Sequence, residues 1–341
     1  MVFRKILYFL SIGYVGTLLL ISIFYYFKTG DVIPEVKLQF ENGNALSPPY
    51  SPLEHFPLGT DNKSKDIFYI ILTGAKYTLG IALLITSLRV VICLFLGAVF
   101  GTYLSRGLKY IKGLVDSWHY FPTTLAVYLI LYWILIQDAL IDGQFTLTFS
   151  ERVLIQITVM VLIGILPLFY LLANEFANIK NLEFIEGVKV LGGKKTYILF
   201  KHAPKFILPK LRFIFLQEVI HVLLLLVHLG VMGMLLGGSV LTKDLFENEI
   251  FTSLTNEWSG LIGLWSRFLW TTYAWMPFIP ITLLTVTILS MQYIVDYLKE
   301  LELNKQVKDS YVKINKKNLE KNKITTNPSN EKFVYLQKKG S

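Results

Sequence analysis

Six long apolar runs constrain this chain more than any other feature of its sequence. An α-helix rises 1.5 Å per residue, so about 20 apolar residues cross the roughly 30 Å hydrocarbon core of a bilayer. The six runs lie near residues 6–27, 78–104, 118–137, 152–174, 211–237 and 271–298. The sequence therefore predicts an all-α, polytopic membrane protein with six transmembrane helices.

Basic residues are distributed unevenly among the segments that connect these runs. The N-terminus, residues 105–117, residues 175–212 and the tail from Lys299 together hold 24 Lys and Arg residues, whereas the intervening loops hold 8. Cytoplasmic loops of membrane proteins carry the excess of Lys and Arg, so both termini are predicted to be cytoplasmic. The same asymmetry accounts for the net charge of +9, and no nucleic-acid partner is expected.

The chain is predicted to have three regions. Residues 1–54 contain the first span, which is too long for a signal-peptide core and is expected to stay uncleaved, and an external linker. Residues 55–299 form the core, with a cytoplasmic loop at 175–210. Residues 300–341 are rich in lysine and asparagine, so they are expected to form a disordered, basic cytoplasmic tail in contact with membrane lipid.

Four separated motifs occur in the core. They are H-F-P-L-G-T-D at 55–61 followed by G-A-K-Y-T-L at 74–79, L-V-D at 114–116 followed by Pro122, E-F-I-E-G-V-K-V-L-G-G at 183–193 followed by Pro209, and E-W-S-G at 257–260 followed by W-M-P at 275–277. In order and approximate spacing these motifs resemble those of permease subunits of the oligopeptide, dipeptide and nickel ABC importers. Ser64 and Lys65 stand where the family has Gly and Arg, and Gly187 and Val188 stand where it has two alanines.

The third motif has a physical interpretation of its own. Apolar residues recur every three positions from Ile179 to Leu191, a pattern typical of a short amphipathic helix. Gly192 and Gly193 then favour a turn, and a second short helix is predicted at 196–201, ending before Pro204. Two short helices at a sharp angle would form a compact projection, here called the knob (residues 183–203).

The resemblance implies a fold like that of type I ABC importer permeases and assigns the knob to coupling with an ATP-binding subunit. The implied coupling residues are Glu183, Glu186, Gly192, Gly193, Lys194 and Lys195. Further implied partners are a second permease subunit that completes a heterodimer and an extracytoplasmic solute-binding protein. The implied location is a bacterial plasma membrane, and the implied cargo is a peptide, with nickel or another small solute as the alternative.

No enzymatic motif accompanies these features. The sequence contains no G-x-x-x-x-G-K-[ST] phosphate loop, no H-E-x-x-H and no G-x-S-x-G. We therefore expect no catalytic residues, no cofactor and no ATP hydrolysis in this chain. Two other classes stay open, namely an autonomous channel or secondary transporter, and a membrane-anchored scaffold whose basic tail is the working part.

The second span carries one charged residue, Arg89. An arginine at the bilayer centre costs about 2.5–3.5 kcal/mol, so it is expected to face a cavity or an acidic group. It either lines the substrate path or forms a structural ion pair with another subunit. Gly97 and Gly101 in the same span predict close contact with a second helix. The lone cysteine, Cys93, excludes an intramolecular disulfide.

The fifth span carries Glu218, His221 and His228 near one helical face. Such a stripe fits the lining of a translocation cavity, hydrogen bonds between packed helices, or ligands for a metal ion. A single helix does not supply three or four converging ligands with their supporting groups, so no metal site is expected.

Overall fold

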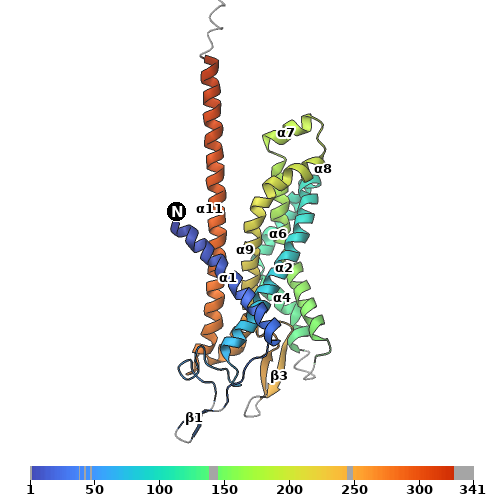
Figure 1. Ribbon diagram of the computed structural model, residues 1–341. Coiled ribbons are helices and arrows are strands. Elements are labelled where there is room, and N and C mark those ends of the chain that lie inside the picture. Colours follow the sequence, from blue (N-terminus) through green and yellow to red (C-terminus); the bar gives the residue numbers. More distant parts are fainter. Residues whose placement is uncertain are drawn as a thin grey trace, which may run out of the picture. The chain divides into compact units, whose positions relative to one another are not determined.

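Helices make up most of the described chain (Figure 1). The structure is a computed structural model, and it describes residues 2–37, 39–41, 44–46, 48–137, 145–243 and 249–325. Five helical segments of these residues are long and apolar enough to cross a membrane. They are α1 (Val2–Thr29), α2 (Ile67–Tyr103), α6 (Phe149–Ile179), the continuous helix Lys195–Val231, and Trp275–Lys305 of α11 (Trp275–Thr325). The predicted all-α, polytopic architecture is confirmed.

The remaining predicted span, 118–137, is not a single helix. After the short helical turn η1 (Ser105–Gly107), α3 (Leu108–Tyr120) and α4 (Thr123–Tyr132) follow, with a π-helical turn η2 (Trp133–Gln137) at the end. Segments Ser105–Trp118 and Thr123–Ile136 meet at 78°. The break falls at Phe121 and Pro122, both extended, because a residue before proline is disfavoured in the α conformation. Two half-length helices therefore replace the predicted straight span.

The core forms where α2 packs along α6 and α9 (Ala203–Val231). The predicted close approach at the two glycines of α2 is confirmed. A Cβ at Gly101 would lie 2.3 Å from the carbonyl oxygen of Ala173 on α6, and one at Gly97 would lie 3.0 Å from Leu172 Cβ. Small residues on α2 thus allow the two backbones to approach each other directly.

A short helix, α10 (Trp258–Trp265), packs between the ends of α2 and α9 and carries the E-W-S-G motif. The fully buried Trp258 donates its indole N–H to the Ile71 carbonyl at 2.9 Å and its backbone N–H to the Thr78 hydroxyl at 2.9 Å. A Cβ at Gly263 would lie 1.8 Å from the Gly230 carbonyl oxygen. The motif therefore fastens this end of the helix bundle.

The remaining elements at this end are short. β1 (Gln39–Glu41) pairs with β2 (Asn44–Leu46), and β3 (Ser239–Lys243) pairs with β4 (Glu249–Ser253), both antiparallel. The turn η4 (Ser266–Phe268) follows α10. Between the predicted spans 118–137 and 152–174, residues 138–144 lie outside the described residues.

The knob contains α7 (Glu183–Val190) and α8 (Lys195–Tyr197), as predicted from the apolar period and the two glycines. The prediction that the second helix ends before Pro204 is wrong. The chain continues through a π-helical turn, η3 (Ile198–His202), directly into α9. Pro204 lies in the first turn of α9, directly after the π-helical turn, and the continuous helix accommodates it there.

The helix α11 extends beyond the predicted sixth span. One compact unit covers Met1–Val295, and Asp296–Ser341 form a second unit. Residues 300–325 are helical, whereas composition predicted disorder. Lys, Glu, Gln and Leu are good helix formers. Extending an existing helix gains one hydrogen bond for each residue that is ordered and avoids the cost of nucleating a new helix. Residues 326–341 of the predicted tail lie outside the described residues.

Candidate functional site

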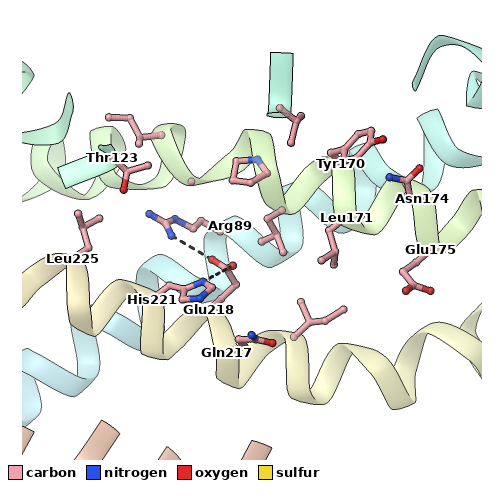
Figure 2. A pocket seen from close by; sticks show the side chains of 16 residues that line it. Arg89, Thr123, Tyr170, Leu171, Asn174, Glu175, Gln217, Glu218, His221 and Leu225 are labelled. Atoms are coloured by element: carbon pink, nitrogen blue, oxygen red, sulfur yellow. Dashed lines mark hydrogen bonds and ion pairs between the residues drawn. The ribbon is translucent and has the colours of Figure 1, made fainter. Parts of the chain in front are cut away.

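A cavity of about 600 Å³ lies among α2, α3, α4, α6 and α9. Much of its wall is apolar, with Val115, Ile163 and Leu225 among the lining residues. Its polar side chains come mainly from α6 and α9, which face each other across it (Figure 2). The break between α3 and α4 also contributes, because it places Thr123 in the wall. This composition, apolar walls with a few converging polar groups, is typical of small-solute sites.

Arg89 of α2 lies at this cavity and is only 4% exposed. Its Nε and Nη2 atoms donate to the carbonyl oxygen of Met160 on α6 at 3.2 and 2.5 Å, and its Nη1 donates to Glu218 Oε2 on α9 at 3.3 Å. Gly164 makes room for the guanidinium, since a Cβ there would lie 2.2 Å from Arg89 Cζ. The arginine thus bridges three helices, and its acidic partner belongs to the same chain.

Glu218 is shared between two basic groups. Its second carboxylate oxygen, Oε1, lies 3.3 Å from Nδ1 of His221, one turn further along α9 (Figure 2). The Glu218 side chain is 14% exposed, whereas that of His221 is 56% exposed. The result is a row from Arg89 through Glu218 to His221 that runs from the buried helix contact to the open cavity. We refer to these three residues as the charged row.

The four residues predicted to line a path are not all brought together. Arg89, Glu218 and His221 line the cavity, whereas His228 is exposed near the end of α9 and is not part of the wall. Among the described residues no group of three or more His, Cys, Asp and Glu side chains is arranged to hold a metal ion.

Other polar residues of the wall were missed by the sequence analysis. They are Tyr170, Asn174, Glu175 and Gln217. Glu175 forms an ion pair with Lys210 that connects α6 to α9. Residue 175 was expected to lie in a loop, because charged residues usually mark the end of a span, whereas α6 continues to Ile179. The sequence did hold a signal for these wall residues: Tyr170, Asn174 and Glu175 are polar residues close together at the end of a long apolar run.

The knob, with α7 and α8, lies at one end of the helix bundle, beyond the end of α6 (Figure 1). Its anchor is Ile185, which is fully buried in a cluster with Phe176, Ile198 and Ile207. Gly192 has φ +85°, a conformation that favours glycine, and a Cβ at Gly193 would lie 2.5 Å from Val188 Cγ1. The two glycines are therefore required by the turn.

The outer surface of the knob is both charged and apolar. Of the six predicted coupling residues, Glu183, Glu186, Gly192, Lys194 and Lys195 are exposed and Gly193 is half-buried. Exposed apolar side chains accompany them, with Val190, Leu191 and Phe200 at 87%, 89% and 79% exposure. Apolar side chains exposed this fully on a small projection are typical of a protein contact surface.

Two buried carboxylates organise the opposite end of the bundle. Asp61 Oδ1 accepts the backbone N–H groups of Lys63 and Lys65, each at 2.8 Å, and burial raises the pKa of Asp61 to about 6. Glu257 accepts the Leu236 N–H at 2.8 Å and the Ser253 hydroxyl at 2.8 Å, and burial raises its pKa as well. Both residues belong to sequence motifs. Asp61 closes the turn that precedes α2, and Glu257 joins the segment after α9 to the start of α10.

The sequence was also compared with known proteins. No protein-family model matches the chain, and no curated protein matches it.

Proposed function

We propose that this chain is a permease subunit of an ABC importer that moves peptides across a bacterial plasma membrane. One observation carries the proposal: the knob, with its exposed charged and apolar surface, is continuous with α6 and α9, two of the helices that line the polar cavity. α6 leads into the knob and α8 leads out of it into α9. Separate ATP-binding subunits would bind the knob and supply the energy.

The geometry supports a simple mechanism. A force on the knob acts on α6 and α9 together, and these helices carry opposite walls of the cavity. The Glu175–Lys210 pair links the two helices at the cavity wall. Two arrangements of the knob would then correspond to two separations of the walls, and a partner that binds one arrangement more tightly shifts the equilibrium toward it.

The cavity suits a small solute with both apolar and polar parts. Arg89 and Glu218 neutralise each other, so the wall offers hydrogen bonds without a large net charge. Nickel or another small solute of the same transporter class is the alternative cargo. A second permease subunit would complete the path, and a solute-binding protein would deliver the cargo at the end that carries α10.

A secondary transporter is the second candidate function. It is favoured by Glu218 and His221, a titratable pair inside a predicted membrane span. Such residues serve as proton relays in carriers. Transport driven by a proton gradient in vesicles that contain only this chain would support the carrier and contradict the permease.

Copurification tests the proposal. The full chain is isolated from its native membranes in a mild detergent, and its partners are identified by mass spectrometry. We expect stoichiometric ATP-binding subunits with the wild-type chain and their loss with Glu186→Lys. The matched control is Lys112→Glu, a charge reversal at an exposed residue of α3 outside the knob. Wild-type preparations without any ATP-binding protein would contradict the proposal.

A further inference from the structure

An apolar groove of about 480 Å³ lies between the end of α2 and the start of α9, separate from the polar cavity. Its size falls within the roughly 300–1,000 Å³ range of small-molecule sites. Its lining includes Phe95, Ala98 and Tyr103 from α2, Phe200 from η3, and Leu208 and Leu211 from α9. Phe95 and Phe200 are 70% and 79% exposed, so the groove is open to the surroundings of the bundle.

Three lysines gather beside one end of this groove. Lys195 Nζ lies 5.7 Å from the centre of the Tyr103 ring, which is itself part of the groove wall. Lys180 Nζ donates to the Ser105 hydroxyl at 3.1 Å, two residues beyond Tyr103. Lys189 Nζ donates to the Lys180 carbonyl at 3.2 Å. Lys180 and Lys195 therefore lie next to the end of α2, and Lys189 lies close to Lys180.

No carboxylate of the described residues pairs with the positive charge of these three ammonium groups. Partial burial and, after it, the charges of Lys195 and Lys189 lower the pKa of Lys180. A negatively charged group placed among the three would remove this repulsion and supply hydrogen-bond acceptors.

We propose that the groove and the lysine cluster together bind an anionic glycerophospholipid of the bilayer. One acyl chain would lie along Phe95, Ala98 and Leu208, and the phosphate would lie between Lys180 and Lys195. The site is at the end of a membrane span, where lipid headgroups are found. This inference is independent of the proposed transport function, because it rests on the groove and the cluster alone.

The apolar groove distinguishes a lipid from a soluble phosphate compound. A soluble anion would satisfy the lysines and leave the groove unused, whereas a phospholipid uses both features at once. A bound lipid would also connect the knob to α2, because Lys189 and Lys195 lie on either side of the Gly192–Gly193 turn. The lipid would thus stabilise the knob in one position.

Native mass spectrometry of the full chain in detergent tests the inference. The protein is titrated with phosphatidylglycerol and, separately, with phosphatidylcholine of the same acyl chains. We expect preferential retention of phosphatidylglycerol. A lysine near an anionic headgroup contributes about five-fold in affinity, so Lys180→Gln with Lys195→Gln should weaken phosphatidylglycerol binding about thirty-fold. Lys180→Arg with Lys195→Arg should keep the preference.

Two further variants separate the features of the site. Lys109→Gln with Lys112→Gln removes the same charge from exposed positions of α3 and should leave binding unchanged. Ala98→Trp fills the groove without touching the lysines and should weaken binding of phosphatidylglycerol. Equal retention of the two lipids by the wild type, wild-type binding by the Lys180/Lys195 glutamine variant, or displacement of the lipid by an equal concentration of glycerol phosphate would overturn the inference.

Discussion

Replacing Arg89 by leucine removes the central contact among α2, α6 and α9. The guanidinium donates two hydrogen bonds to Met160 and one to Glu218, and it is almost fully buried. Without it, His221 is the one partner that Glu218 keeps among the described residues. Removing one member of a buried ion pair costs about 3–5 kcal/mol, because the remaining charge is left without compensation. The Glu218 side chain retains 14% exposure at the cavity, so we expect a loss near the lower end, about 3 kcal/mol.

A double-mutant cycle isolates the free energy of the interaction between Arg89 and Glu218. Arg89→Leu, Glu218→Leu and the double variant are compared by reversible unfolding in mixed detergent micelles. The double variant leaves no unpaired charge, so it should be more stable than the sum of the single losses predicts, by about 2 kcal/mol. Arg89→Lys keeps the charge but loses the planar set of donors and should fall between wild type and Arg89→Leu. Losses that add within about 0.5 kcal/mol would refute the role of the pair.

Three further predictions follow from the packing, the buried acid and the loop charges. Gly263→Ala should lower the free energy of unfolding by about 1–3 kcal/mol in the same assay, because the added Cβ would meet the Gly230 carbonyl. Gly80→Ala, which has open space around it, should not destabilise the protein. Equal effects of the two substitutions would count against the packing of α10. Burial raises the folded-state pKa of Asp61 from 3.8 to about 6, so its stabilising contribution is full below pH 3.8 and is lost as the pH rises through 6. The wild type should lose about 1 kcal/mol between pH 5 and 8, and Asp61→Asn, which keeps the Oδ1 acceptor, should not; identical pH dependence would contradict this. Cysteines at Ser239 and Ser310 should react with a membrane-impermeant maleimide from opposite sides, and labelling of both from outside would overturn the six-span topology.

The fold was predictable from sequence because hydrophobic length alone determines whether a helix can cross a bilayer. The break at Pro122 and the continuity at Pro204 were harder to predict. Pro122 interrupts the helix, because the residue before it, Phe121, is extended. Pro204 is accommodated, because it lies in the first turn of α9 directly after a π-helical turn. Which outcome occurs depends on tertiary packing rather than on local sequence.

The location of the polar cavity was also partly predictable from the sequence. A charged residue within a span must find a partner, so Arg89 identified the region of the cavity. Its partner Glu218 could not be assigned, because the pairing depends on how α2 and α9 are placed and on the space left by Gly164. His228 shares a helical face with His221 by spacing, yet it lies outside the wall, because the cavity extends along only part of α9.

Cross-linking from the knob tests the proposed function most directly. Leu191 is 89% exposed at the tip of the knob, and a cysteine there, with Cys93 replaced by alanine, provides one reactive thiol. A short bifunctional reagent applied to native membranes should join it to an ATP-binding protein, and ATP should change the yield. A cysteine at Lys109, exposed on α3, should give no such product. Absence of any ATP-binding protein among the Leu191→Cys products would contradict the account.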